Sequence, residues 1–400
     1  MARKVTVIGI GTGGDGLTVK AAKAIAASDL VIGARRMLDS VDTGKAETLE
    51  EYRSKEIVEY LGANPSFSDV SVLMSGDVGF YSGAKKLLEA LKGGEFEVAV
   101  EPGISSLVYL SAMMGTSWQD AYLTSAHGRE ANLVGISRCH AKVFTLLSAQ
   151  DTVHAMCRQF MDYEMDVTIT VGQDFGLPTE RLTSGKPAEL LGKEFGDLCV
   201  AMIENPDPDT ANPIGIPDEE FVRGDAPMTK SEVRALSVAK LKLSDDSVVY
   251  DIGAGTGSVS IEMALVAYNG MVYSVEKEDA AADLIEVNKK KFKAPNVQVI
   301  RGLAPEAMQD LPAPTHAFIG GSSGNLKEIV QCLLSKNPDV RIVINSVTIE
   351  TMAETMEVAK DLGLAEEDVT CINVSRARKL GRYHLMTAQN PVYIAVVRGR

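Results

Sequence analysis

The second half of the chain contains a glycine-rich segment that directly follows a run of apolar residues. It reads Asp251-Ile-Gly253-Ala-Gly255-Thr-Gly257, so a carboxylate precedes three alternating glycines. Glycines let a backbone approach a ligand closely and take positive φ angles. A second acid, Glu276, ends the next apolar run, 19 residues past Gly257. An acid at that place can bind the two hydroxyls of a ribose, so the pattern predicts a nucleoside site at a strand-to-helix turn.

Two ligand classes compete for this geometry. A dinucleotide site uses the spacing Gly-x-Gly-x-x-Gly, whose glycines hold a pyrophosphate. The spacing here is Asp-x-Gly-x-Gly-x-Gly. S-adenosylmethionine carries no phosphate but has an ammonium and a sulfonium, and the leading Asp251 suits that cationic end. We therefore favour a methyl-donor site, and a tight turn that merely closes a strand-helix unit is the alternative.

A second glycine loop lies near the N-terminus. Gly9, Gly11 and Gly14 match Gly-x-Gly-x-x-Gly after a strand, which is compatible with a dinucleotide. The acid expected after the second strand is missing, because Arg35 and Arg36 stand there. Arginines at this place could instead bind a 2′-phosphate. By itself this motif does not choose between an NADP site and another ligand.

The elements that must position these loops alternate between β-branched runs and helical stretches. Strands are predicted at 4–10, 30–32, 70–74, 97–100, 142–147, 167–171, 247–252, 270–275, 297–300, 316–319, 340–345, 369–373 and 392–397. Helices are predicted at 18–27, 81–91, 232–241, 258–267, 280–292, 325–334 and 349–362. This alternation predicts an α/β protein with mostly parallel sheets covered on both faces. A stretch rich in proline and aspartate predicts a linker at 205–222 between domains at 1–204 and 223–400.

Composition excludes several classes of protein. The chain has 400 residues, of which 45% are hydrophobic and 24% charged, as in ordinary globular proteins. No apolar run approaches the ~18–20 residues of a membrane helix, and the N-terminus lacks a signal peptide, so we expect a cytoplasmic protein without membrane contact. The five cysteines are scattered and form no Cys-x-x-Cys, which predicts neither a disulfide framework nor a metal site. Residues 1–222 carry a net charge of −13 and residues 223–400 a net charge of −1, so we expect no nucleic-acid partner.

Four further segments of the second half carry a family resemblance. They are Gly224-Asp-Ala-Pro-Met-Thr-Lys-Ser-Glu-Val-Arg234, Arg301-Gly-Leu-Ala-Pro-Glu-Ala307, Phe318-Ile-Gly-Gly-Ser-Ser-Gly-Asn325 and Ile344-Asn-Ser-Val-Thr-Ile-Glu350. From about Arg223 to Arg400 the sequence resembles the decarboxylating precorrin C-15 methyltransferases of cobalamin biosynthesis. The resemblance implies a Rossmann-like class I methyltransferase fold. It also implies donor contacts from Thr229, Gly253, Ala254, Gly255, Thr256, Gly257, Glu276 and Ala304.

The first half resembles a different family. The segments that carry the resemblance are Leu17-Thr-Val-Lys-Ala-Ala22, Ser75-Gly-Asp77-Val-Gly-Phe80-Tyr-Ser82, Glu101-Pro-Gly-Ile-Ser-Ser106 and Ser125-Ala-His127-Gly-Arg129. They are similar to tetrapyrrole methylases over residues 3–203, and most closely to the precorrin C-5 methyltransferase branch. The resemblance implies two α/β subdomains that bind S-adenosylmethionine in the cleft between them. The implied donor contacts are Ile10, Asp77, Phe80, Ser105, Ser106 and Leu147.

Two positions depart from the family pattern, and two motif residues have simpler interpretations. The family usually has proline where Thr12 and Val78 stand, and the loss of proline predicts looser loops and weaker donor binding. Asp77 could instead cap a helix that begins at Tyr81. His127 could be a buried histidine whose nitrogens are satisfied within the core.

The two halves together resemble the bifunctional, decarboxylating precorrin C-5,15-methyltransferases. This implies S-adenosylmethionine at one site per domain, a small tetrapyrrole substrate with or without cobalt, and a homo-oligomer, either a dimer or a tetramer. The reaction implied is displacement at the sulfonium methyl by an electron-rich ring carbon, with loss of the C-12 acetate carboxyl as carbon dioxide. Because the leaving group is a neutral thioether, alignment and exclusion of water can carry the methylation.

The remaining candidates concern the substrate. A precorrin carries many carboxylates, and Arg376, Arg378, Lys379 and Arg382 form a basic run that could bind them. A solvated basic loop is the alternative. Asn345, Glu350, Tyr383 and His384 could assist the decarboxylation, or could only satisfy nearby backbone groups.

Other functions also stay open at this point. The first half could be an NADP-binding module, and the second half could methylate a macromolecule. One methyltransferase site could also be inactive, in which case Thr12 and Val78 make the first half, as a tetrapyrrole-binding module, the stronger candidate.

Overall fold

The structure is a computed structural model that describes residues 3–128 and 131–399, without the side chains of Asp15 and Glu367. Contacts within the chain define two compact units. The first contains most of residues 3–206. The second contains residues 207–399 together with 131–140 and 159–165.

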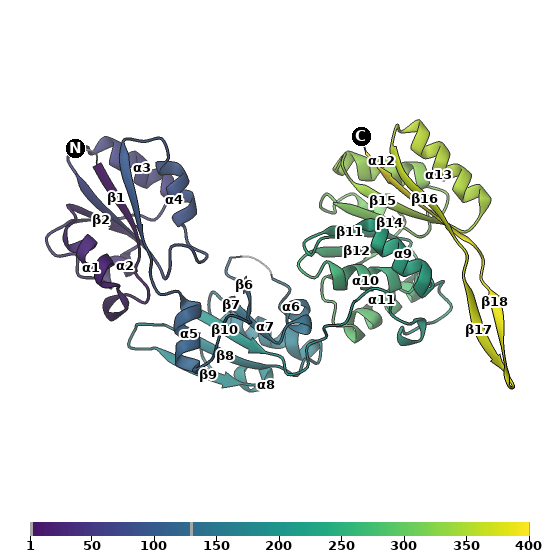
Figure 1. Cartoon of the computed structure of the whole chain (residues 1–400), viewed down its shortest axis with the longest axis horizontal. Helices are drawn as coiled ribbons and strands as arrows, with labels where there is room; N and C mark the ends of the chain where they lie inside the picture. The colour runs from purple at the N-terminus through teal and green to yellow at the C-terminus, as the bar shows by residue number, and fades with distance from the viewer. Residues whose placement is uncertain (1–2, 129–130, 400) are drawn as a thin grey trace. The chain divides into compact units, whose positions relative to one another are not determined.

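The first unit begins with a parallel five-stranded sheet in the order β3-β2-β4-β1-β5. Its strands are β1 (Arg3–Gly9), β2 (Leu30–Gly33), β3 (Glu47–Glu50), β4 (Asp69–Met74) and β5 (Phe96–Glu101). Helices α1 (Val19–Ala26) and α2 (Arg35–Asp39) cover one face of the sheet, and α3 (Ser54–Ala63) and α4 (Ala84–Leu91) cover the other (Figure 1). Apolar side chains from both faces of β1 are therefore buried, as expected for a central parallel strand.

A second sheet in this unit has the order β6-β7-β10-β8-β9. Its strands are β6 (Tyr122–Ser125), β7 (Lys142–Leu146), β8 (Thr168–Gln173), β9 (Arg181–Gly185) and β10 (Cys199–Glu204). The helices of this part are α5 (Ser106–Met114), most of α7 (Gln150–Asp162) and α8 (Pro187–Leu190). The helix α6 (Leu133–Cys139) and the end of α7 belong to the second unit. Only β6 and β7 pair in parallel, so this sheet is the exception to the mostly parallel pairing predicted. The reason is that β10 inserts between β7 and β8, and β8 continues into β9 as an antiparallel pair.

The second unit is built on a seven-stranded sheet in the order β13-β12-β11-β14-β15-β19-β16. Its strands are β11 (Val248–Ile252), β12 (Met271–Glu276), β13 (Val297–Arg301), β14 (His316–Ile319), β15 (Arg341–Ser346), β16 (Ala365–Ile372) and β19 (Val392–Arg398). The first five in this order are parallel, and β19 runs antiparallel to both β15 and β16. The Rossmann-like sheet expected of the second half is therefore present.

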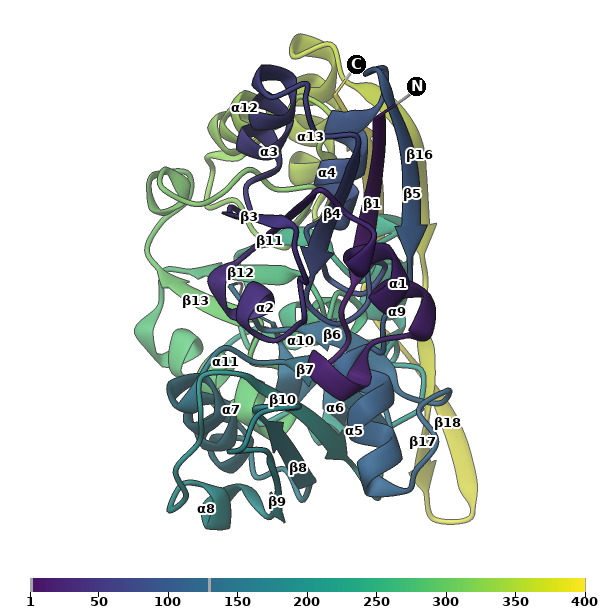
Figure 2. The same cartoon turned by 90° about the vertical axis from the view of Figure 1, so that its left-hand side faces the viewer.

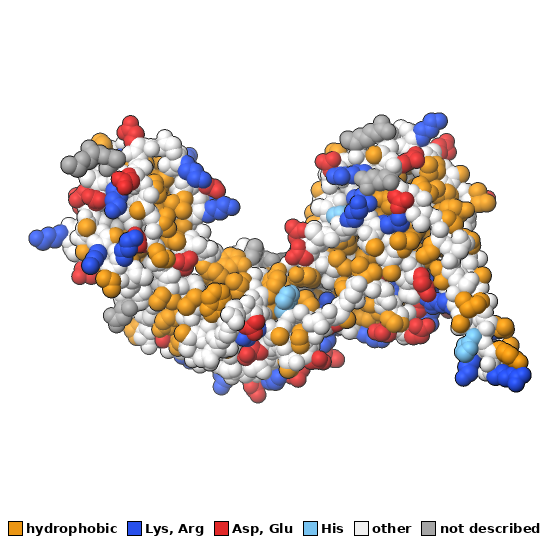
Figure 3. All heavy atoms as spheres, in the orientation of Figure 1, with side chains coloured by type: hydrophobic (Ala, Val, Ile, Leu, Met, Phe, Trp, Pro, Cys, Tyr) orange, Lys and Arg blue, Asp and Glu red, His pale blue; other side chains and the backbone are white. Residues whose placement is uncertain are grey.

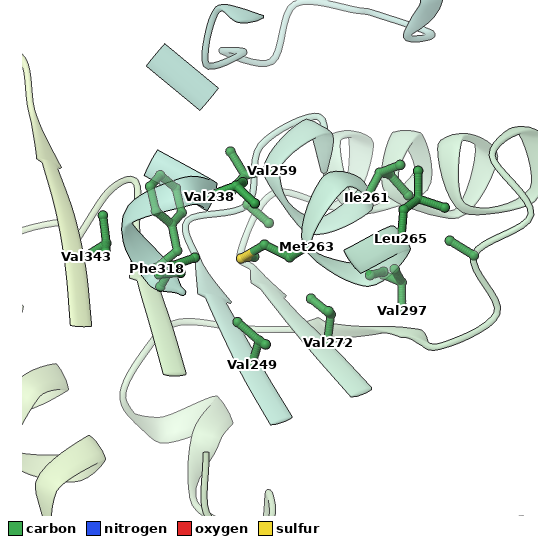
Figure 4. Packing of buried hydrophobic residues seen from close by; sticks show 14 of the residues in the cluster. Val238, Val249, Val259, Ile261, Met263, Leu265, Val272, Val297, Phe318 and Val343 are labelled. Carbon is green, nitrogen blue, oxygen red and sulfur yellow. The ribbon is translucent and has the colours of Figure 1, made fainter. Parts of the chain in front are cut away.

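Helices cover both faces of this sheet. They are α9 (Ser231–Leu241), α10 (Ser258–Val266) and α11 (Asp279–Lys291) on one face, and α12 (Leu326–Lys336) and α13 (Ile349–Asp361) on the other. Figure 4 shows how the strand residues Val249, Val272 and Phe318 pack with Met263 and Val259 of α10. Val259 and Met263 are four residues apart, so they lie on the same face of α10, which packs on the sheet.

The predicted linker is partly built into the second unit. Ile216 and Phe221 pack against its core, and Asp218 is buried in a short 3-10 turn, η2 (Asp218–Glu220). The backbone N–H of Ile216 donates to Glu262 Oε1 at 3.0 Å, and that of Val222 donates to Asn288 Oδ1 at 2.9 Å. Side chains thus satisfy a proline-rich backbone that forms neither helix nor strand here, and the segment at 214–222 is not a free linker.

The basic run that the sequence analysis interpreted as a substrate contact, with a solvated loop as the alternative, lies on a β-hairpin. Strands β17 (Ser375–Leu380) and β18 (Tyr383–Ala388) pair only with each other. Both views show this two-stranded arm extending away from the sheet of its own unit (Figures 1 and 2). No helix within the described residues combines the length and apolar character needed to span a membrane.

Candidate functional site

A cavity of about 280 Å³ in the first unit opens beside the carboxyl ends of β1 and β4. Five of the six predicted donor contacts line it, namely Ile10, Asp77, Phe80, Ser106 and Leu147. The sixth, Ser105, does not line it. Its hydroxyl caps α5 by accepting a hydrogen bond from the N–H of Val108 at 3.3 Å.

Asp77 joins two of the loops that form this cavity. Its Oδ1 accepts a hydrogen bond from the N–H of Gly79 at 2.8 Å, and its Oδ2 accepts one from Gly103 at 3.2 Å. The alternative that Asp77 caps a helix from Tyr81 is wrong, because α4 begins at Ala84, whose N–H donates to the hydroxyl of Ser82 at 3.2 Å. Asp77 instead fixes the loop after β4 against the loop after β5.

These loops approach so closely that a glycine is needed where they meet. A Cβ on Gly103 would lie 2.3 Å from the carbonyl oxygen of Gly76 and 2.5 Å from that of Gly9. The carboxyl ends of three neighbouring strands therefore come together at this point. This close approach explains why the loops after β1, β4 and β5 each carry a glycine at the point of contact.

The loop at Thr12 is held by packing rather than by proline. Thr12 lines the cavity, and a Cβ on Gly176 would lie 2.2 Å from the Thr12 carbonyl oxygen. Val78 is half-buried and packs against the core of the first sheet. The looser donor binding expected from these two positions stays a prediction.

His127 is exposed and lines the same cavity, so the interpretation as a buried core histidine is wrong. Its Nδ1 lies 3.1 Å from the hydroxyl of Ser148. Its neighbour in the motif, Arg129, lies outside the described residues.

Sequence reasoning missed a group of lining residues from the second sheet and its loops. They are Leu146, Phe175, Leu177, Leu198, Cys199 and Val200. Burial raises the pKa of the Cys199 thiol to about 11, so it stays protonated. No motif marks these residues, because they belong to the cavity only through the order in which the strands pair.

The second unit has a cavity of about 350 Å³ at the carboxyl ends of β11, β12 and β14. Predicted donor contacts that line it are Thr229, Gly253, Ala254, Gly255, Glu276 and Ala304. Thr256 and Gly257 lie buried behind the wall, where Gly257 caps α10 with a φ of 76°. Lining residues not predicted as contacts are Pro227, Ile252, Val275, Lys277, Glu278, Gly302, Leu303, Gly320, Gly321, Ser322 and Ser323. Most of them belong to the segments that carry the family resemblance.

Two glycines of the loop after β11 leave no room for a side chain. Gly253 has a φ of 72°, and a Cβ there would lie 2.7 Å from the carbonyl oxygen of Gly321. Gly255 has a φ of 57°, and a Cβ there would lie 2.5 Å from the carbonyl oxygen of Pro227. The spacing of the glycines thus reflects close contact with two other loops of the cavity wall.

Glu276 occupies the place predicted for it, at the end of β12. Its Oε2 accepts a hydrogen bond from the N–H of Gly255 at 2.8 Å, and its Oε1 accepts one from Glu278 at 3.0 Å. The carboxylate therefore faces the cavity while it holds the glycine loop. A ribose diol can be bound by an acid in this position.

Asp251 lies behind the cavity wall, not in it. Its Oδ2 accepts a hydrogen bond from Ser260 of α10, and its Oδ1 has no hydrogen-bond partner among the described residues. Burial, reinforced by the charge of Glu276 and opposed by the Ser260 hydrogen bond, raises the pKa of Asp251 to about 7. Asp251 connects β11 to α10, and the structure does not place it against the donor's cationic end.

This raised pKa gives a testable dependence of stability on pH. The carboxyl of Asp251 ionises near pH 4 in the unfolded chain and near pH 7 in the folded one, so folding takes up a proton between these values. Its contribution to stability is therefore complete below about pH 4 and declines by up to about 1.4 kcal/mol per pH unit towards pH 7.

We expect the free energy of unfolding of the second unit to fall less from pH 5 to pH 7.5 in Asp251→Asn than in the wild type. Denaturant titrations at several pH values, followed by hydrogen exchange of peptides from β11 and α10, measure this difference. Parallel pH profiles for the two proteins would contradict the assignment.

The basic run divides into an anchored residue and three exposed ones. Arg376 Nε donates to Glu232 Oε1 at 2.8 Å, and Arg376 Nη1 lies 3.2 Å from Asp218 Oδ2, so this residue fixes the base of the hairpin. The hydrogen bond from Arg376 lowers the pKa of Glu232. Further along the hairpin, Arg378, Lys379 and Arg382 are exposed.

The hairpin also exposes apolar side chains. In Figure 3 its end carries basic and apolar side chains close together. The exposed apolar residues are Leu380, Tyr383, Leu385 and Met386. An exposed surface of this mixed kind suits a flat, apolar ring with carboxylates at its edge.

None of the four candidates for the decarboxylation lines the cavity of the second unit. Asn345 hydrogen-bonds Ser237 of α9 at 3.0 Å, and Glu350 is exposed in the first turn of α13. Tyr383 and His384 are exposed on β18, where the Tyr383 hydroxyl accepts a hydrogen bond from Arg382 at 2.7 Å. Within the described ranges no group of three metal-ligating side chains comes together.

Two family descriptions match the chain, one for each half. The family "Tetrapyrrole (Corrin/Porphyrin) Methylases" matches residues 4–191, and the family "Precorrin methyltransferase domain" matches residues 220–398. The first match includes the lining residues of the first cavity from Ile10 to Leu177, and the second includes the whole donor cavity of the second unit.

Curated proteins and a solved structure are also similar to this chain. A precorrin-6Y C(5,15)-methyltransferase [decarboxylating] of Sinorhizobium sp. is 30% identical over 392 residues, which cover 94% of this chain and 92% of the relative. A probable cobalt-precorrin-6B C(15)-methyltransferase (decarboxylating) of Pyrobaculum calidifontis is 42% identical over 183 residues, or 45% of this chain and 93% of the relative. The crystal structure of a precorrin-6Y C5,15-methyltransferase from Geobacter metallireducens covers 47% of this chain and 97% of that chain, at 40% identity and a TM-score of 0.45.

Proposed function

Because the chain belongs to the family of decarboxylating precorrin-6Y C(5,15)-methyltransferases, we propose that it methylates a precorrin or cobalt-precorrin at C-5 and C-15. It also removes the carboxyl group of the C-12 acetate side chain, as a step of cobalamin biosynthesis. The observation that carries this proposal is that the similarity to the Sinorhizobium enzyme extends over 94% of the chain and so includes both cavities.

We assign one methyltransferase to each half of the chain. Residues 1–204 methylate C-5, and residues 223–400 methylate C-15 and release carbon dioxide, with 205–222 joining them. Two cavities whose loops require glycine, one in each unit, support this division. A cytoplasmic location and a homo-oligomeric assembly, as dimer or tetramer, stay predictions.

S-adenosylmethionine is the methyl donor that we propose for both cavities, and it supplies a methyl group activated by a sulfonium. The residues of the second cavity fit it, because Glu276 can accept hydrogen bonds from ribose hydroxyls and Gly253 and Gly255 line the cavity with backbone alone. In the first cavity, Asp77 holds the loops around the donor, and Ile10, Phe80 and Leu147 supply apolar contacts.

The substrate ring meets a different set of side chains. We propose that Arg378, Lys379 and Arg382 of the hairpin bind its carboxylates, with Tyr383 and Leu380 against the ring. Arg376 acts indirectly, since its pairing with Glu232 and Asp218 fixes the hairpin. Asn345, Glu350, Tyr383 and His384 stay candidates for the decarboxylation.

A second candidate function follows from the two positions where the first half departs from its family. If Thr12 and Val78 abolish donor binding, the first unit serves only to bind tetrapyrrole, and the chain performs the C-15 reaction alone.

Mass spectrometry of the product distinguishes the two functions. The full chain is incubated with S-adenosylmethionine and precorrin-6B, with and without cobalt in the ring. We expect a gain of two methyl groups and the loss of one carbon dioxide. One methyl group with loss of carbon dioxide would support the second candidate. Absence of turnover with both rings, while the donor binds, would overturn the precorrin assignment.

A further inference from the structure

A second cavity in the C-terminal unit takes no part in the proposed chemistry. Its volume is about 420 Å³, and its lining residues are Lys242, Thr315, His316, Asn337, Asp339, Arg341 and Arg398. It lies where β14 and β15 begin and β19 ends, whereas the donor cavity lies where β14 ends. The two cavities thus lie at opposite ends of the strands of one sheet. A volume of this size suits a small molecule.

Three basic side chains form a row across β14, β15 and β19 at this end of the strands. His316 is paired in register with Arg341 on the neighbouring strand, and Arg341 is paired with Arg398 on the next. Residues paired in register point to the same face of a sheet, so the three side chains lie beside one another. Lys242, at the end of α9, adds a third full positive charge to the cavity wall, and Asp339 is the one carboxylate among the described side chains that line it.

The backbone holds this row in place. Arg341 Nε donates to the carbonyl oxygen of Lys240 at 2.8 Å, and Arg398 Nε is 3.4 Å from that of Asp339. The hydroxyl of Thr315 donates to the carbonyl oxygen of Val248 at 2.9 Å. His316 Nδ1 lies 2.8 Å from the same hydroxyl oxygen. These contacts orient Arg341 and His316 before any ligand binds, which lowers the entropic cost of binding.

The strand register places the guanidinium groups of Arg341 and Arg398 side by side at the cavity wall. A planar guanidinium is well suited to charge-assisted hydrogen bonds with an oxyanion. We propose that this cavity, here called the basic-row cavity, binds a small oxyanion with several oxygens, a phosphate or a polycarboxylate, between Arg341, Arg398 and Lys242.

The protonation equilibrium of His316 is consistent with a positive electrostatic potential in the cavity. Burial, together with the charges of Arg341 and Arg398, lowers the pKa of His316 to about 4. Among the side chains that the structure describes, the charged groups that line the cavity with it are Arg341, Arg398, Lys242 and Asp339. A bound oxyanion favours the protonated imidazole, so binding raises this pKa and the ring reports on occupancy.

The test uses the full chain at constant ionic strength. Calorimetric titrations with inorganic phosphate, pyrophosphate and tricarballylate separate phosphate from carboxylate as the preferred chemistry. We expect one site per chain, and a loss of affinity of about tenfold or more in Arg398→Gln and in Lys242→Gln. Lys360→Gln on α13 is the matched control, since it removes the same charge from an exposed position outside the cavity.

An NMR measurement keeps the test valid if a variant folds poorly. The chain has five histidines, and His316→Gln identifies the signal of His316 in the labelled wild type. At pH 5.5 we expect pyrophosphate to move this signal towards the protonated form.

Three outcomes would overturn the proposal: no binding of any of the three anions, equal loss in Lys360→Gln and Arg398→Gln, or no movement of the His316 signal at saturation. Binding of a poly-glutamate peptide without binding of the small anions would also overturn it, and would identify the cavity as a contact for an acidic protein segment.

Discussion

A Gly253→Ala variant should lose C-15 methylation and decarboxylation and keep C-5 methylation. Alanine at a φ of 72° costs about 1–2 kcal/mol, and its Cβ would lie 2.7 Å from the Gly321 carbonyl oxygen. Relief of this contact requires the loops after β11 and β14 to separate, and both loops line the donor cavity. Since about 1.4 kcal/mol corresponds to a factor of ten, we expect donor affinity at this cavity to fall about 100-fold or more.

The measurement combines calorimetric titration of the donor with product mass. We expect the wild type to bind two molecules of S-adenosylmethionine per chain and the variant to bind one at the same concentrations. The product should gain one methyl group and retain its carboxyl. Gly62→Ala in α3 is the control, because a Cβ there meets no atom within 4 Å and its φ is not positive. Full C-15 activity in Gly253→Ala would show that the donor does not bind against this loop.

An Asp77→Ala variant should show the reciprocal loss. The substitution removes the acceptor for the N–H groups of Gly79 and Gly103 and so releases the loop after β4 from the loop after β5. Hydrogen bonds to a charged group contribute about 1.5–3 kcal/mol each, and part of that is screened here because the site is open to solvent. We expect kcat/KM for C-5 methylation to fall about 10- to 100-fold.

Asp77→Asn is the informative companion variant. Its amide oxygen can accept from Gly79 N–H, whereas its nitrogen cannot accept from Gly103 N–H, so we expect an intermediate loss. C-15 methylation and decarboxylation should be unchanged in both variants, and this serves as the internal control for folding and donor quality. If the alanine variant retains full C-5 activity, Asp77 does not organise the donor site, and the role assigned to the first cavity is wrong.

Local signals in the sequence were sufficient for much of the fold. The strands around Val249 and Val272 alternate or run apolar over four to six residues. The helix through Met263 is buried on all sides and is mostly apolar, with Ser260 and Glu262 among its buried polar residues. The hairpin was harder to predict. The run from Arg376 to Arg382 has no apolar alternation, since its strands pair only with each other and both faces are exposed.

The sequence by itself determined the two glycine loops, the acid at Glu276 and the family of each half, because glycine spacing and strand ends are encoded over a few adjacent residues. Only the tertiary structure decided which side chains reach a cavity. Asp251 belongs to the motif yet lies behind the wall, Arg376 belongs to the basic run yet is paired with Glu232, and the row of His316, Arg341 and Arg398 exists only through strand register. The physical reason is that the partner of a polar side chain, and therefore its charge and its availability, depends on elements that are distant in the chain and meet only when the sheets assemble.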